Sequence, residues 1–187
     1  ALIDEGQRIY PQISCRPLMN EFHFREPFAF GRLDMFQPVA QADNEGKKRI
    51  YSDPAFREKL KQSLEDARTA PVSIAELADA WDAAEISYCP QRPELEGRYV
   101  AEIANDEGVH SIDIALDLSV DSDFATRFRI PAANANEKGV EELLRDPNTH
   151  LGLSDAGAHA SQLCDACYPT DLLGRWVREK KVLTLER

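Results

Sequence analysis

The sequence predicts an α/β fold in which parallel strands alternate with helices. Strand-like segments lie near residues 8–15, 82–89, 124–131 and 150–154, and segments with helical periodicity separate them. Such alternation is typical of a mostly parallel sheet covered by helices. Apolar residues make up 43% of the 187 residues, which is enough to form a core.

The first part of the chain predicts a helix end followed by a strand. Residues 1–6 are expected to be the last turn of a helix that ends at Gly6. Residues 8–15 then have an extended pattern, which Arg16 and Pro17 interrupt because a proline disfavours a helical conformation of the residue before it. Arg16 therefore stands at the carboxyl end of the predicted strand.

Residues 18–52 are rich in aromatic side chains and show little periodicity. We expect an irregular loop or lid whose aromatic residues form the apolar walls of a pocket. The lone His23 is interpreted as an ordinary packed or exposed histidine. The aromatic residues are Phe22, Phe24, Phe28, Phe30, Phe36 and Tyr51.

Helix signals become clear after this segment. Ser52-Asp53-Pro54 supplies a cap and a first-turn proline for a helix to about Ala67, and Ser73 to Ala80 adds a predicted turn. Further helices are expected at four places: 98–105, ended by Gly108; 112–118, capped by Ser111 with His110 at its entry; 137–144, capped by Asn136; and after Pro169-Thr170.

Bulk composition excludes some classes of function. The net charge of −11 argues against binding to nucleic acid or to anionic membranes, since phosphate contacts require clustered Lys and Arg. The sequence contains neither a run of 18 apolar residues nor the apolar core of a signal peptide. We therefore expect a cytoplasmic protein.

The four cysteines include one closely spaced pair, Cys164 and Cys167. A structural zinc site usually has two such pairs, and a redox pair needs its own strand–turn–helix context. Two small loop residues are therefore the preferred interpretation over a metal or redox role, and Cys15 and Cys89 stand alone in the sequence.

The segment with the strongest candidates for catalytic side chains runs from 149 to 165. Leu151 and Leu153 form a short apolar run that leads directly into Ser154-Asp155, and His159 follows on a loop of small residues. Enzymes with α/β folds commonly present catalytic groups in this way, at the end of a buried strand.

Four stretches resemble one known family. They are Gly-Leu-Ser-Asp-Ala-Gly-Ala-His at 152–159, the run from 169 to 186, the Gln-x-Ser-Cys-Arg-Pro pattern at 12–17, and the pattern at 95–118 that contains Glu-Ile-Ala and Ser-Ile-Asp-Ile-Ala-Leu-Asp-Leu. They resemble the amidohydrolase superfamily, in the branch of the N-acyl-D-amino-acid deacylases and related amidohydrolase-3 proteins. The resemblance implies a (β/α)8 TIM-type barrel of the metal-dependent hydrolase kind.

A complete barrel of this kind needs about 250 residues, so residues 1–187 are predicted to be the C-terminal portion of the barrel domain. Residues 18–80 would be a loop and helical insertion over the active-site face. Because a partial barrel leaves sheet edges uncovered, a homo-oligomer or a swapped assembly is also expected.

The resemblance also assigns roles to single residues. In the related enzymes a zinc centre activates water, and the aspartate after the last strand moves a proton from that water to the leaving amine. Asp155 matches this aspartate and is also a candidate metal ligand, although an aspartate capping a turn explains it too. His159 matches a histidine near the substrate, with an ordinary loop histidine as the alternative. Arg16 could bind a substrate carboxylate or simply close a turn at the surface.

The sequence also departs from the family pattern. It contains no His-x-His pair, and its histidines at 23, 110, 150 and 159 lack the spacing of zinc ligands. The chain alone is therefore expected to lack a competent metal centre and to be inactive. Residues 162–168 also lack the arginine typical of the N-acyl-D-amino-acid deacylases, so either the substrate differs or Arg16 binds its carboxylate.

Two hypotheses follow. The first is a fragment of a zinc-dependent amidohydrolase that acts on a small-molecule amide, such as an N-acyl-D-amino acid. The second is a non-catalytic α/β module with a structural or binding role.

Overall fold

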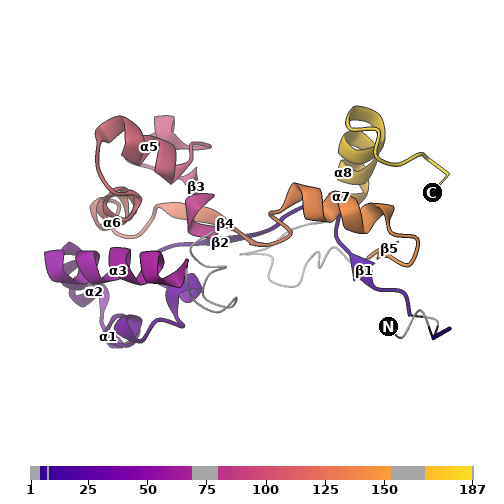
Figure 1. The fold of residues 1–187 in the computed structure, drawn as a ribbon. Coiled ribbons are helices and arrows are strands. Elements are labelled where there is room, and N and C mark those ends of the chain that lie inside the picture. Colours follow the sequence, from indigo (N-terminus) through magenta and orange to yellow (C-terminus); the bar gives the residue numbers. More distant parts are fainter. Residues whose placement is uncertain (1–4, 8, 69–79, 153–166, 187) are drawn as a thin grey trace. The chain divides into compact units, whose positions relative to one another are not determined.

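The computed structural model describes residues 5–7, 9–68, 80–152 and 167–186 and has both helices and strands (Figure 1). The chain divides into two compact units. One consists of Ala1–Met19 together with Pro131–Arg187, and the other is Asn20–Ile130. We call them the split unit and the inserted unit, because the second interrupts the sequence of the first.

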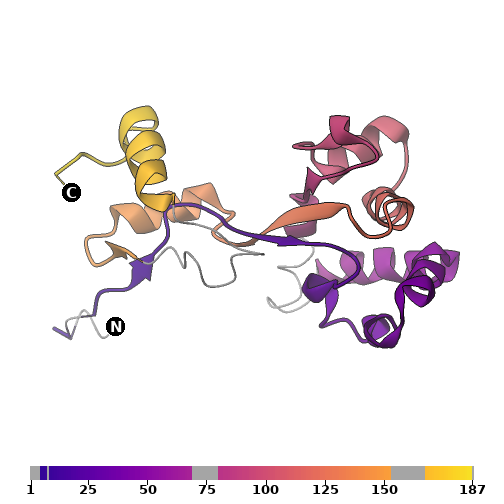
Figure 2. The same ribbon diagram turned by 180° about the vertical axis from the view of Figure 1, so that it is seen from behind.

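The split unit is built on two parallel strands. Strand β1 (Gln12–Ile13) pairs with β5 (His150–Leu151), with Gln12 opposite His150. Figures 1 and 2 both show these strands side by side. Helix α7 (Glu137–Arg145) lies between them in sequence, and α8 (Tyr168–Asp171) continues into a π-helix, η4 (Leu172–Glu179). Strand, helix and parallel strand thus follow the order of a β–α–β unit.

Apolar side chains of the helices pack against the strands of the split unit. Ile13 and Leu151 contact a buried cluster that consists of Cys15, Val140, Leu144, Trp176 and Val182. Gln12 and His150, the neighbours of these two strand residues, are exposed. Since successive strand residues point to opposite faces, the β1–β5 pair has one face covered by helices and one polar face.

The inserted unit contains a three-stranded sheet in the order β2-β4-β3. Its strands are β2 (Leu18–Phe22), β3 (Glu85–Tyr88) and β4 (Arg127–Ala133). Strands β3 and β4 are antiparallel, with Ile86 opposite Phe128 and a bulge before Tyr88. The first residues of β2 and the last residues of β4 belong to the split unit, so the chain passes between the units along these strands.

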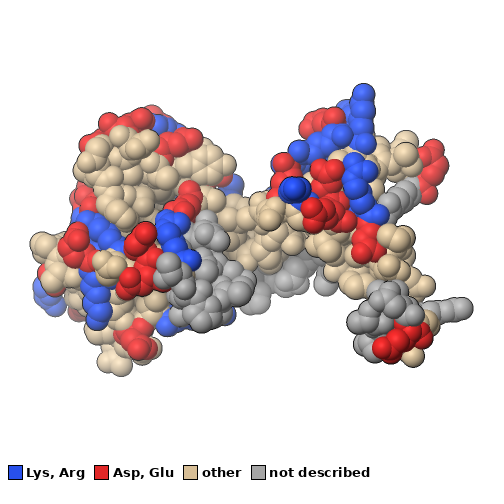
Figure 3. Space-filling view, viewed as in Figure 1, with Lys and Arg blue, Asp and Glu red and all other residues tan. Residues whose placement is uncertain are grey.

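Helices cover the apolar face of this sheet. They are α1 (Gln37–Gln41), α2 (Asn44–Ser52), α3 (Pro54–Ala67), α5 (Val100–Glu107) and α6 (Ser111–Asp121), with 3-10 turns at Phe28–Phe30, Asp34–Phe36 and Pro93–Leu95. On the face shown in Figure 3, acidic and basic side chains are interspersed over α2 and α3. Arg57, for example, binds Asp117 of α6 at 2.6 Å.

The prediction that 18–52 is irregular, with aromatic residues that form the walls of a pocket, was wrong. This segment forms β2, two 3-10 turns, α1 and α2, and its aromatic residues make the core of the inserted unit. Phe24 and Phe30 are completely buried, and the Tyr51 hydroxyl donates a hydrogen bond of 2.8 Å to the Phe24 carbonyl. The aromatic residues therefore pack against one another, and only Phe28 among them is largely exposed.

Most of the predicted helices are confirmed, with small corrections at their ends. Asp53 caps α3, Asn136 caps α7, and Gly108 ends α5 in the left-handed region at φ 69°. The cap of α6 is His110 and not Ser111, because the His110 Nδ1 accepts a hydrogen bond from the Ile112 amide at 3.1 Å. Residues 81–82 end a helix, so the strand predicted from 82 begins only at Glu85.

The α/β character is confirmed, whereas the expected all-parallel arrangement is not. The β1–β5 pair is parallel and the β3–β4 pair is antiparallel. Within the described ranges the strands form two small sheets, and these do not close into a barrel. The turn predicted at 73–80 lies almost entirely outside the described residues, as do residues 1–4 of the predicted first helix. None of the described helices has the length and apolar character required to cross a membrane.

Candidate functional site

Arg16 stands at the carboxyl end of β1, three residues after Ile13. The Ser14 hydroxyl donates to the Arg16 carbonyl at 3.3 Å, so a tight turn forms here. Just before it, the Cys15 carbonyl accepts a hydrogen bond of 2.6 Å from the Trp176 indole. Since Trp176 is buried, this bond anchors the end of β1 to the helix that follows β5 in sequence.

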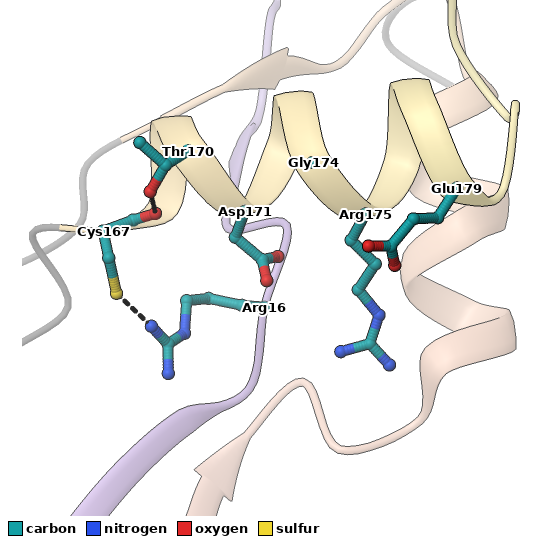
Figure 4. Close-up of a pocket in the computed structure, with 7 residues that line it drawn as sticks. All are labelled: Arg16, Cys167, Thr170, Asp171, Gly174, Arg175 and Glu179. Carbon is teal, nitrogen blue, oxygen red and sulfur yellow. Dashed lines mark hydrogen bonds between the residues drawn. The ribbon is translucent and has the colours of Figure 1, made fainter.

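The Arg16 side chain lines an open hollow of about 490 Å³ in the split unit. Figure 4 shows Arg16 extending along the start of the α8–η4 helix, with its guanidinium donating to the Cys167 thiol. The hollow is lined by Arg16, Cys167, Thr170, Asp171, Gly174, Arg175 and Glu179. Arg16 therefore lies at a turn and also lines this hollow.

Charges of both signs surround this hollow. Arg16 and Arg175 supply guanidinium groups, and Asp171 and Glu179 supply carboxylates. Arg175 also contacts Glu137, the first residue of α7, and the Lys180 ammonium binds the same carboxylate at 2.9 Å. The hydrogen bonds from Lys180 and Arg175 lower the pKa of Glu137. Arg175 is therefore partly neutralised by Glu137.

The Cys15 thiol lies near Asp171, which lines the hollow, and is not suited to be a nucleophile. It is buried and donates to the Tyr168 carbonyl at 3.2 Å, with Asp171 Oδ2 at 3.8 Å. Burial, followed by the nearby charge of Asp171, raises the pKa of Cys15 to about 11. Since the thiolate is the reactive form, this residue is inert near neutral pH.

The other residues singled out in the sequence fall into two groups. Asp155, His159 and Cys164 lie outside the described residues. His23 and His110 each accept a backbone hydrogen bond through Nδ1, from Glu26 and Ile112 respectively. Burial lowers the pKa of both histidines, which fits this use of the neutral ring. These two side chains therefore stabilise local backbone.

The described ranges hold no group of three or more His, Cys, Asp or Glu side chains arranged to bind a metal ion. His150 is exposed, and its ring packs edge-on against Tyr10 at a centroid distance of 5.0 Å. Cys15 and Cys89 are buried free thiols, and Cys167 is an exposed one. The described residues therefore do not fit a zinc centre by themselves.

Sequence reasoning missed two features of this region. Asp171 and Arg175 line the hollow from α8 and η4, and their spacing of four residues is the signal that could have placed them on one helix face. The close approach of β5 to β1 at Gly152 was also missed, because the pairing of two strands so far apart in the chain is not encoded locally.

Comparison with known proteins gives only distant relatives. The chain is 28% identical over 127 residues to uncharacterized proteins of Mycobacterium bovis and of two strains of Mycobacterium tuberculosis. The match covers 67% of this chain and 20% of each relative, so the chain spans about a fifth of their length. No family model matches the chain. No solved structure matches it either.

Proposed function

We propose that the chain is part of a metal-dependent amidohydrolase that hydrolyses an amide C–N bond other than a peptide bond, such as that of an N-acyl-D-amino acid. The observation that carries this proposal is the parallel pairing of β1 with β5. Arg16 follows β1 closely, and Ser154-Asp155 follows β5 closely in the sequence. In α/β enzymes, ligands bind where the carboxyl ends of neighbouring parallel strands meet.

The proposed fold is a portion of a (β/α)8 barrel. Supporting this is the order β1, α7, β5, with helices covering one face of the strand pair. The repeating element of such a barrel is a strand, a helix and a parallel strand. The inserted unit, Asn20–Ile130, would interrupt one such repeat. The predicted placement of 18–80 over the active-site face stays a prediction.

Three residues receive roles in this proposal. Asp155 would take a proton from the attacking water and pass it to the leaving amine, which requires a carboxylate within hydrogen-bond reach of both. Arg16 would bind the substrate carboxylate with its two parallel N–H donors. His159 would contact the substrate near the reacting amide. A zinc ion would need ligands from outside the described residues, with Asp155 as one candidate.

The Asp155→Asn variant of the full-length protein tests this proposal. We expect kcat for amide hydrolysis to fall by about 10²–10⁴-fold, the usual worth of general acid–base catalysis, while metal content per chain stays the same. Asp121→Asn is a matched control, because Asp121 is the exposed last residue of α6. Near-wild-type turnover of Asp155→Asn would reduce Asp155 to a turn residue. A wild-type protein without amidase activity would instead favour a non-catalytic binding module.

A further inference from the structure

Gly152 lies where β5 ends and makes an unusually close approach to β1. Its amide donates a hydrogen bond of 2.8 Å to the Ile13 carbonyl, and the His150 amide donates one of 3.0 Å to the Pro11 carbonyl. These bonds fix the distance between the two strands. Gly152 is buried, and it comes two residues after His150, so any side chain at this position would point to the face that carries Gln12.

A side chain at this position would collide with β1. A methyl carbon at Gly152 would lie 2.4 Å from Gln12 Cβ, 3.1 Å from Cγ and 3.2 Å from Oε1. The outer atoms of Gln12 can rotate away, but Cβ is fixed to the backbone. A carbon–carbon contact is comfortable only at about 3.5–4.0 Å, so the strands would have to separate by about 1 Å. The absence of a side chain at Gly152 is therefore required for the observed spacing.

We propose that Gly152 is a positioning residue, whose missing side chain lets β5 lie against Gln12 and thereby sets the end of β1, with Arg16, at its working distance from the end of β5. This inference rests on the proposed function. A displacement of about 1 Å at a site can cost on the order of 10²-fold in rate. Gly152 would act in this way without touching the substrate.

The position of β1 can be read without measuring activity. Cys15 lies two residues after the end of β1, is 1% exposed, and is held through its carbonyl by Trp176. Separation of the strands would break this arrangement and expose the Cys15 thiol. Alkylation of the Cys15 peptide, followed by mass spectrometry of the full-length protein, therefore reports the position of β1.

The experiment compares Gly152→Ala with the double variant Gly152→Ala/Gln12→Gly. The double variant adds a methyl group at position 152 and removes the whole Gln12 side chain, Cβ included, which relieves the collision. For Gly152→Ala we expect at least tenfold faster alkylation of Cys15 and a loss of about 10²-fold in kcat/KM. For the double variant we expect both values to return to within about threefold of wild type, by the same steric reasoning. Gly139→Ala is the matched control, because a methyl carbon on α7 would meet its nearest neighbour, Asn136 Cγ, at an ordinary 3.5 Å.

The possible outcomes separate this inference from the proposed function. Wild-type alkylation of Cys15 in Gly152→Ala, or a double variant that stays as impaired as the single one, would overturn the inference. If Gly152→Ala fails to fold, recovery of folded protein in the double variant supports the inference, and its absence overturns it. If wild type hydrolyses no amide, the proposed function fails, and the role of Gly152 in strand spacing is decided by alkylation alone.

Discussion

Replacement of Phe24 by alanine tests the finding that the aromatic residues of 18–52 form a core. The Phe24 ring is completely buried and has five aromatic neighbours at centroid distances between 5.5 and 6.3 Å. A Phe→Ala change in a core usually costs about 3–5 kcal/mol, the larger values occurring where the cavity cannot collapse. The neighbouring rings also pack against one another, so they cannot easily move into the cavity that the variant leaves. We therefore expect about 4 kcal/mol for Phe24→Ala.

The same segment offers a matched control. Phe28 is 44% exposed, so Phe28→Ala removes less buried surface and opens no closed cavity. Full burial of a phenylalanine side chain is worth about 1.5–3 kcal/mol, and we expect about 1 kcal/mol for this variant. The two variants should thus differ by about 3 kcal/mol, a large part of the total stability of about 5–15 kcal/mol typical of a domain.

Urea unfolding followed by Trp81 fluorescence measures this difference. Trp81 is buried in the same cluster as Phe24, and a Trp176→Phe background removes the signal of the other tryptophan. With a urea m-value of about 2 kcal/mol per molar, the midpoint should fall by about 2 M for Phe24→Ala and about 0.5 M for Phe28→Ala. Equal shifts of the urea midpoint for the two variants would refute the finding that these aromatic residues form a core. If Phe24→Ala impaired substrate binding without lowering stability, the aromatic residues would instead be the walls of a pocket.

Two further predictions concern pH. Burial lowers the pKa of His110. The stability contributed by its neutral ring is therefore present above pH 6.5 and is lost as the pH falls through the lowered pKa. Below that pH the protonated Nδ1 can no longer accept the hydrogen bond from the Ile112 amide. His110→Asn, which keeps a cap, should abolish this pH dependence of the urea midpoint, and an unchanged slope would contradict the assignment. The pKa of Cys15 is raised from 9.0 to about 11, so its contribution is present below pH 9 and is lost between pH 9 and 11. In Cys15→Ala this alkaline loss should be smaller, and an equal loss would place its origin elsewhere.

The helices could be predicted because their signals are local. Asp53 before Pro54, Asn136 before α7 and Gly108 after α5 each act within one helical turn of their own position. The cap of α6 was misplaced by one residue because a serine is a far commoner cap than a histidine. Only the structure shows that the His110 ring accepts the hydrogen bond from the Ile112 amide.

The aromatic core of the inserted unit could not be predicted because it depends on contacts between distant residues. Phe24 packs on Trp81 and Phe128, which the sequence separates by long intervals. The elements at 28–41 are also short, since α1 has five residues and its two neighbouring 3-10 turns have three each. Such elements carry too few residues to show a period, so densely spaced aromatic residues were interpreted as a lid.

The candidate site was predicted in part for a related reason. Arg16 was recognised from the strand that precedes it, and Pro17 fixed the break at the right place. Its partners in the hollow, Asp171 and Arg175, come from a helix at the other end of the chain. Asp155 and His159 were singled out by resemblance, and they lie outside the described residues.

A whole unit is inserted between β1 and α7, yet the β1–β5 pair keeps its spacing because of how the chain enters and leaves this insertion. The chain leaves the split unit along β2 and returns along β4, and these strands are neighbours in one sheet. Neighbouring strands lie about 5 Å apart, so both connections to the insertion run along one pair of adjacent strands. The distance between β1 and β5 is then set locally, by their hydrogen bonds and by the contact of Gly152 with Gln12. Phe24→Ala should therefore destabilise the inserted unit and leave the alkylation of Cys15 unchanged. Gly152→Ala should speed the alkylation of Cys15 and leave the stability of the inserted unit unchanged.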